Sequence, residues 1–456
     1  NAGGTLIPDA DGRLPLHAAC RPGKDVPARR RREMEREAKE DGWEKTPQEV
    51  LVGGLLESDP GAANIKDGEG NLPLHYACRS HGQKVVDALL DSYPDGASVV
   101  SEGSGLVPLQ IACGALRPKY EQYEKGKDVD GIVGRLVKLH PEGARASGGK
   151  KEENKSSDSN TTKEWGLPLH IISASSALSP HLSNETVLAL IAANPDAVRT
   201  KDAEGNLPLH NAIRNRPHDT AKSTVLIRSL LREYPAAALE HDFRDNLPLH
   251  ITLTHARGGT GTGSTYRRIS KLLFDAHPDA VLRPDTAGRL PAHRVAKILG
   301  ETGGVGKDMP GWATLLREIA ERNPSALVEK DDRGRTPLHC LCFSLSDAVS
   351  DLAEAGKSPK KSSDIMEGVF RFLLTEGPEA LDVEDGGGNR PRDMMENDRR
   401  LGHLGEDRGE LSPTFTALKR EVMKGSKHWK TIGAVDPEEK IKKEQPMESK
   451  AGSDEL

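Results

Sequence analysis

The sequence contains few aromatic residues: Phe, Trp and Tyr together make up 4% of its 456 residues. A core must therefore be built mainly from Leu, Ile, Val and Ala, which suits small, closely packed helices better than a sandwich or barrel. No stretch approaches the roughly 18 consecutive apolar residues that a membrane-spanning helix needs. The formal net charge of −6 contains no basic excess, so bulk electrostatics does not indicate binding to nucleic acid.

The sequence also lacks a disulfide framework and a cofactor motif. Its five cysteines are odd in number and irregularly spaced, and we interpret them as core residues. Cys340 and Cys342 do not have the two-residue separation of zinc or thioredoxin motifs. Residues 303–307 resemble a phosphate-binding loop, but Glu301 stands where that motif needs Gly and Asp308 where it needs Ser or Thr. We expect no cofactor and no metal.

What the sequence does contain is an internal repeat. The string Leu-Pro-Leu-His recurs at Leu14–His17, Leu72–His75, Leu167–His170, Leu207–His210 and Leu247–His250. Variants occur at Val107–Gln110, Leu290–His293 and Thr336–His339, and a ninth, divergent copy at Arg390–Asp393. Proline is favoured at the first position of a helix, because it has no N–H to satisfy and its φ is already helical. Each copy therefore predicts the start of a short helix.

A second helix is predicted before most copies. Apolar residues at spacing i, i+3 and i+4 precede a proline, as with Val187, Leu190 and Ile191 before Pro195, and this spacing places them on one helix face. That proline cannot continue the helix and predicts its end. The distance from this proline to the next motif proline is 13 residues in six of eight cases, which indicates a rigid connector. Within it, Asp and Gly usually lie six and three residues before the motif proline, a pattern typical of a tight turn.

The repeats resemble those of the ankyrin family, whose signature is a turn followed by Thr-Pro-Leu-His-x-Ala. The best matches are Gly334–His339 and Pro73–Ala77. The resemblance implies an all-α solenoid of about eight to nine stacked helix-turn-helix units over residues 1–396. It also implies binding through the face made by the turns and first helices. Six copies have Leu in place of the family's Thr, so they lack an N-cap hydroxyl worth about 1 kcal/mol, and we expect packing to compensate.

Several segments lengthen the repeat. Insertions at 21–46, 114–130, 254–266, 300–311 and 346–363 are expected between first and second helices, and 146–163 lengthens one turn connector. Residues 397–456 are predicted to be a charged, largely disordered tail with one candidate capping helix at Phe415–Met423. The ending Ser453–Leu456 resembles an endoplasmic-reticulum retention signal, although its first residue departs from that signal. The sequence favours the cytoplasm or nucleus and leaves the endoplasmic-reticulum lumen open.

The motif histidines admit two interpretations, either as metal or pH-sensing groups or as structural hydrogen-bonding residues. They are His17, His75, His170, His210, His250, His293 and His339. Equivalent residues of stacked repeats lie about 10 Å apart, one helix diameter. Zinc ligands must lie about 2 Å from a single ion, so a column of equivalent histidines chelates poorly. We interpret these residues as structural.

The function predicted from the sequence is a non-enzymatic scaffold that binds a protein partner through the turn and first-helix surface. No nucleophile, base and orienter pattern is present, and the repeats occupy most of the chain. Residues after the motif His are the candidates for partner binding: Tyr76, Ile171, Asn211, Ile251 and Arg294. The partner is expected to be a protein, no nucleic acid and no membrane span are predicted, and the array is expected to be monomeric. The alternative is the regulatory repeat region of a larger enzyme or channel, with residue 1 inside a longer array.

Overall fold

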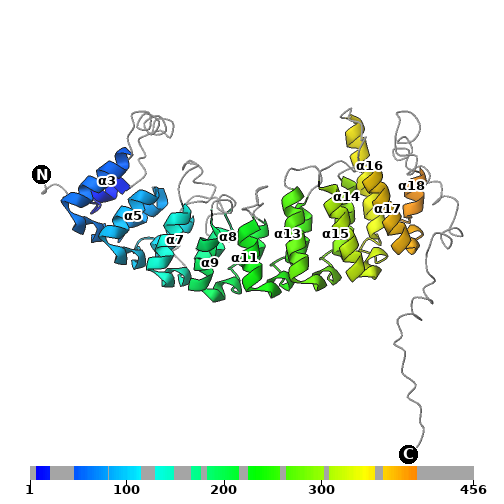
Figure 1. Ribbon diagram of the computed structural model, residues 1–456, viewed down its shortest axis with the longest axis horizontal. Coiled ribbons are helices and arrows are strands. Elements are labelled where there is room, and N and C mark those ends of the chain that lie inside the picture. Colours follow the sequence, from blue (N-terminus) through cyan, green and yellow to red (C-terminus); the bar gives the residue numbers. More distant parts are fainter. Residues whose placement is uncertain are drawn as a thin grey trace, which may run out of the picture. The chain divides into compact units, whose positions relative to one another are not determined.

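The computed structural model describes residues 7–20, 46–80, 82–114, 129–147, 166–175, 182–214, 224–256, 263–301, 308–354 and 363–397. These residues form helices and connecting turns, with no strand among them. Figure 1 shows the described helices coloured in chain order from blue to orange. The chain divides into two compact units. The first comprises residues 1–256 and 264–280, and the second comprises residues 257–263 and 281–456. No described helix is long and apolar enough to cross a membrane.

The first unit consists of two layers of stacked helices. One layer contains the first helices of the repeats, each beginning at a motif proline: α1 (Pro15–Cys20), α4 (Pro73–Ser80), α6 (Pro108–Gly114), α8 (Pro168–Ser173), α10 (Pro208–Arg214) and α12 (Pro248–His255). The other contains the second helices: α3 (Pro47–Ser58), α5 (Gln83–Ser92), α7 (Val129–Leu139), α9 (Asn184–Ala193), α11 (Val225–Glu233) and α13 (Gly263–Ala276). Neighbouring first helices contact one another, as do second helices from α3 to α11. The unit is therefore an all-α repeat solenoid, as the sequence predicts.

The second unit repeats this arrangement. It contains the pairs α14 (Pro291–Glu301) with α15 (Met309–Arg322) and α16 (Pro337–Glu354) with α17 (Ser363–Glu376), followed by α18 (Pro391–Asn397). Helix α14 contacts α16, α16 contacts α18, and α15 contacts α17. The described residues of both units together form eight helix pairs and the first helix of a ninth repeat, which agrees with the predicted number of repeats.

The stop prolines do more than end the second helices. Each one begins a 3₁₀ helix: η2 (Pro60–Asn64), η3 (Pro94–Ser98), η5 (Pro141–Arg145), η6 (Pro195–Val198), η8 (Pro235–Leu239), η9 (Pro278–Leu282), η10 (Pro324–Leu327) and η11 (Pro378–Leu381). The residue before a proline is disfavoured in the helical region, and Tyr93, for example, has φ −145° and ends α5. The sequence analysis did not predict the short helix that follows, in which proline again occupies the first position.

The core is aliphatic, as the scarcity of aromatic residues predicts. An alanine two or three residues after each stop proline is buried, which lets the 3₁₀ helix pack closely on its neighbours. All five cysteines are buried, and none of them forms a disulfide. Burial raises the pKa of the Cys20 thiol to about 12 and that of Cys340 to about 11. These thiols are therefore protonated at neutral pH and pack as small apolar side chains.

Two predicted insertions are shorter in the structure than in the sequence analysis. Helix α16 continues to Glu354, so residues 346–354 of the segment predicted as an insertion at 346–363 are helical. They include neither Gly nor Pro, so nothing in them ends the helix. Similarly, α14 extends to Glu301 and α15 begins at Met309, within the predicted insertion 300–311.

Other predictions concern residues outside the described part of the chain. Most of the predicted insertions at 21–46, 114–130 and 146–163 and the middle of 254–266 fall there. So do residues 398–456 of the predicted tail, with the candidate helix Phe415–Met423 and the ending Ser453–Leu456. These remain predictions.

Candidate partner-binding surface

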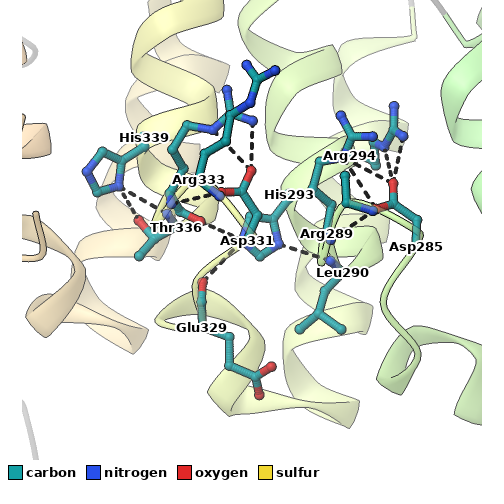
Figure 2. Close-up of polar contacts among 12 residues, drawn as sticks. Asp285, Arg289, Leu290, His293, Arg294, Glu329, Asp331, Arg333, Thr336 and His339 are labelled. Carbon is teal, nitrogen blue, oxygen red and sulfur yellow. Dashed lines mark hydrogen bonds and ion pairs between the residues drawn. The ribbon is translucent and has the colours of Figure 1, made fainter. Parts of the chain in front are cut away.

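The turn before each first helix is closed by a repeated set of hydrogen bonds. In the turn of Asp331, the Asp331 N–H donates to the Arg335 carbonyl at 2.9 Å and the Gly334 N–H to the Asp331 carbonyl at 2.8 Å. Asp331 Oδ1 accepts the N–H groups of Arg333 and Arg335, both at 2.9 Å (Figure 2). Gly334 has φ 74°, where a side chain is strained. The same pattern surrounds Asp9, Asp67, Asp202, Asp242, Asp285 and Asp385.

One turn explains the single 14-residue connector. Ser101 stands in place of the aspartate, one residue earlier relative to the motif proline. Its N–H donates to the Leu106 carbonyl at 3.0 Å, and its hydroxyl accepts the Ser104 N–H at 3.2 Å. Gly105 retains a positive φ of 71°. The turn is thus one residue longer, with a hydroxyl replacing the carboxylate.

Asp245 occupies the position that is glycine in most turns, with φ 60°. We expect Asp245→Gly to raise the free energy of unfolding by about 0.5–1 kcal/mol, because it relieves an unfavourable left-handed conformation and loses part of that gain to chain entropy. Urea unfolding followed by circular dichroism measures the change.

The matched control for Asp245→Gly is Gly205→Ala. Gly205 has φ 86°, and an added Cβ would meet nothing closer than the Phe243 Cβ at 3.8 Å. The left-handed backbone conformation alone should then lower the free energy of unfolding of Gly205→Ala by about 1 kcal/mol. A neutral or destabilising Asp245→Gly would contradict the assignment of strain at this position.

Adjacent turn tips are joined through their backbones. The Gly68 N–H donates to the Asp11 carbonyl at 2.9 Å, and the Gly103 N–H to the Glu69 carbonyl at 2.7 Å. In the second unit the Gly386 N–H donates to the Arg333 carbonyl at 2.7 Å. Gly68 has no room for a side chain, because a Cβ there would lie 2.7 Å from the Asp11 oxygen. These bonds fix successive tips relative to one another and make the turn face rigid where they occur.

The motif histidines hydrogen-bond within the protein. In His75, Nδ1 accepts the Leu72 N–H at 2.9 Å and Nε2 lies 3.0 Å from the Val99 carbonyl, to which it donates. The first bond satisfies the backbone at the N-terminus of α4, where the family has a threonine. Gln110, which replaces the histidine in one copy, makes both bonds: Oε1 accepts the Val107 N–H at 3.2 Å and Nε2 donates to the Ala146 carbonyl at 3.1 Å.

The other motif histidines follow this arrangement with variations. The rings of His17 and His339 reach carbonyls of the next turn, Asn71 and Asn389. His293 contacts two carbonyls, those of Glu329 and Arg335 (Figure 2). Burial lowers the pKa of His17, His75, His170, His210, His293 and His339, that of His75 to about 4. Among the described residues, no three His, Cys, Asp or Glu side chains are grouped to hold a metal ion.

Three of the five residues predicted to bind a partner contact their own turn aspartate. The Tyr76 hydroxyl donates to Asp67 Oδ2 at 2.6 Å, and the Asn211 amide donates to Asp202 Oδ2 at 2.7 Å. Arg294 Nη2 donates to Asp285 Oδ2 at 2.6 Å. The aspartate therefore uses one oxygen to close its turn and the other to attach the turn to the first helix. These side chains lie on the turn face, partly buried.

Ile171 and Ile251 lie elsewhere. Their side chains are 3% and 6% exposed and pack in the core. They leave no surface for a partner to contact, so we omit them from the proposed binding surface. The position after the motif His is therefore not uniformly a surface position: the two isoleucines pack inward, whereas Tyr76, Asn211 and Arg294 reach the turn.

Sequence analysis missed two exposed aromatic side chains on this face. Phe243 lies at a turn tip and is 51% exposed, with the guanidinium carbons of Arg214 and Arg244 each 4.9 Å from its ring centroid. Arg214 is also ion-paired with Asp242. The second, Phe343 of α16, is 39% exposed. Phe243 follows the turn aspartate, where five of the six other Asp turns have Ala, Gly or Thr, and this is the signal that could have identified it.

Arginines gather on the turn face of the second unit. Figure 2 shows Arg289 and Arg294 converging on Asp285, and Arg335 pairs with Asp331 at 2.7 Å. Burial raises the pKa of Asp285, but hydrogen bonds from Arg294 and from backbone N–H groups outweigh burial and hold that pKa below its ordinary value. The same balance lowers the pKa of Asp331. Both carboxylates remain ionised at neutral pH and orient the guanidinium groups.

Comparison with known proteins identifies the repeat. The family model described as Ankyrin repeat matches residues 69–101, which begin within the turn of Asp67 and contain α4, α5 and η3. The predicted resemblance to ankyrin repeats is thereby confirmed. No curated protein matches the chain.

One solved structure to which the chain is similar is titled Bd0816 Predatory Endopeptidase from Bdellovibrio bacteriovorus in complex with immunity protein Bd3460. The identity is 15% and the TM-score 0.33, over 53% of this chain and 97% of that chain. A likeness at this level carries no conclusion about function.

Proposed function

We propose that this protein is a non-enzymatic interaction module that binds a protein partner through the surface formed by its turns and first helices. The observation that carries the proposal is the placement of Phe243 and Phe343. They are the two exposed phenylalanines among the described residues, and both lie on this surface. Each lies near arginine side chains, and aromatic residues and arginine are enriched at the energetic centres of interfaces.

Preorganisation supports the same function. Association costs free energy for ordering side chains and loops, and that cost falls when the surface is already ordered. Here the turn aspartates fix both their own backbone and the first-helix side chains, and tip-to-tip hydrogen bonds hold neighbouring turns. A partner would meet a surface whose side chains are already oriented.

The test is an affinity capture with the full chain as bait and mass spectrometry as the readout. We expect partners that are retained by the native chain and reduced at least about tenfold by two double variants, Phe243→Ser with Arg244→Glu and Arg333→Glu with Phe343→Ser. All four side chains are exposed, so folding should be preserved, which circular dichroism checks.

The control variant carries the same chemical changes on the second-helix layer, Leu51→Ser of α3 with Arg232→Glu of α11, both exposed. It should retain the partners. If every captured protein survived both turn-face variants, or was lost equally from the control, the turn face would not be the binding surface.

A further inference from the structure

The second unit contains a hollow on its turn face. It is lined by Arg333, Arg335, Phe343, Asp385, Gly386 and Gly387. Phe343 belongs to α16, and the other five residues belong to the turns before α16 and before α18. Gly386 and Gly387 carry no side chain, so a ligand can approach the backbone of that wall closely.

The cations of this hollow are only partly neutralised. Arg335 is held by Asp331 through Nε at 3.0 Å and Nη2 at 2.7 Å, which leaves its other N–H groups without that partner. Arg333 is exposed, and its side chain has no hydrogen bond or ion pair within the described residues. Asp385, the carboxylate in the lining, accepts the N–H groups of Gly387 and Asn389 and the Asn389 amide. It is therefore committed to its own turn.

The neighbouring repeat holds two further oriented arginines. Arg289 of the turn and Arg294 of α14 have their guanidinium groups oriented by Asp285, and Figure 2 shows them beside the turn of Asp331. Arg289 and Arg294 share the buried carboxylate of Asp285, and Arg335 pairs with that of Asp331. Arg333 has no such partner among the described residues, so its guanidinium group is open to a carboxylate of a ligand. Phe343 adds an apolar surface to the same hollow.

We propose that this hollow binds a short acidic segment of a partner protein, with one apolar side chain against Phe343 and carboxylates on Arg333 and the free edge of Arg335. The proposal rests on the proposed function and specifies the partner's chemistry. Guanidinium groups held in a fixed orientation favour planar carboxylates, because two parallel N–H···O bonds can form at once. The aromatic surface supplies the desolvated centre that charge pairs alone lack.

A peptide fits this hollow better than a nucleic acid. The chain has a net charge of −6, and the carboxylates of Asp332, Glu384 and Asp385 lie in the turns that border the hollow. A continuous polyanion would have to pass these groups, whereas a peptide can place individual carboxylates only where the arginines are.

The experiment selects short random peptides displayed on phage against the full chain. We expect the enriched peptides to combine Asp or Glu with Leu, Phe or Trp. A fluorescein-labelled copy of the most enriched peptide, measured by anisotropy, should bind at least about tenfold more weakly to Arg333→Glu and to Phe343→Ser than to the native chain. Arg232→Glu on α11 is the matched charge-reversal control and should leave binding unchanged.

Other outcomes would overturn this inference. They are enriched peptides without acidic residues, binding unaffected by the two variants, no enrichment, or equal competition by single-stranded oligothymidine. The failure of this inference can be told apart from failure of the proposed function. If capture in the preceding experiment depended on Phe243 and Arg244 but not on Arg333 and Phe343, the interaction module would stand and this hollow would not be its site.

Discussion

Lowering the pH from 7 to 5 is expected to reduce the free energy of unfolding by about 2 kcal/mol through His75 alone. Burial lowers the pKa of this histidine from 6.5 to about 4 in the folded protein. Between these values the unfolded chain binds a proton and the folded chain does not, so stability is fully present above about pH 6.5 and is lost as the pH falls toward 4. Protonation would also break a hydrogen bond, because Nδ1 accepts the Leu72 N–H and cannot do so when it carries a proton.

Five other motif histidines have pKa values shifted in the same direction and should add to this loss. Four of the turn aspartates should not contribute in this pH range. The pKa values of Asp67, Asp285, Asp331 and Asp385 lie below the ordinary value of 3.8, so these groups are ionised in both states at pH 5. Urea unfolding at a series of pH values measures the dependence.

The chain offers a matched control for this prediction in Gln110. Its amide makes the same two hydrogen bonds as His75 without a titratable ring. His75→Gln should therefore remain folded at pH 7 and lose about 2 kcal/mol less stability than the native chain between pH 7 and pH 5. An unchanged pH dependence in this variant would show that His75 does not stay neutral in the folded protein.

The second large effect is expected from Gly300→Ala at the end of α14. A Cβ there would lie 2.7 Å from the Leu341 carbonyl oxygen and 2.7 Å from the Ser344 Cβ, both in α16. These are not ends of flexible side chains, so the helices would have to move apart. We expect Gly300→Ala to lower the free energy of unfolding by about 2–3 kcal/mol, which is typical of overpacking a well-packed core.

The control for Gly300→Ala is Gly54→Ala in α3. This glycine is exposed, and an added Cβ would meet no atom within 4 Å. The same substitution should then stabilise the protein by up to about 1 kcal/mol through helix propensity. If Gly300→Ala were neutral while Gly54→Ala behaved as expected, α14 and α16 would not approach as closely as the structure shows.

The sequence by itself determined the repeat and its local geometry. Pro at the first helical position, Asp and Gly at fixed positions before it, and apolar residues at helical spacing each act through contacts within a few residues. Short-range patterns therefore predicted the two helices, the turn and the positive φ of Gly334. They also predicted that the motif histidines form structural hydrogen bonds, as His75 does with Leu72 and Val99.

Only the tertiary structure decided which residues reach the surface. Tyr76, Asn211 and Arg294 turn toward the aspartate of their own turn, whereas Ile171 and Ile251, at the same position of the repeat, pack inward. The polar side chains reach an aspartate nine residues earlier in the chain, whereas the isoleucines are buried in the core, and the common position in the repeat does not distinguish the two outcomes. The hollow beside Phe343 also depends on the tertiary structure, because its walls come from two turns more than 50 residues apart that the stacking of α16 and α18 brings together. Sequence spacing within one repeat carries no information about that distance.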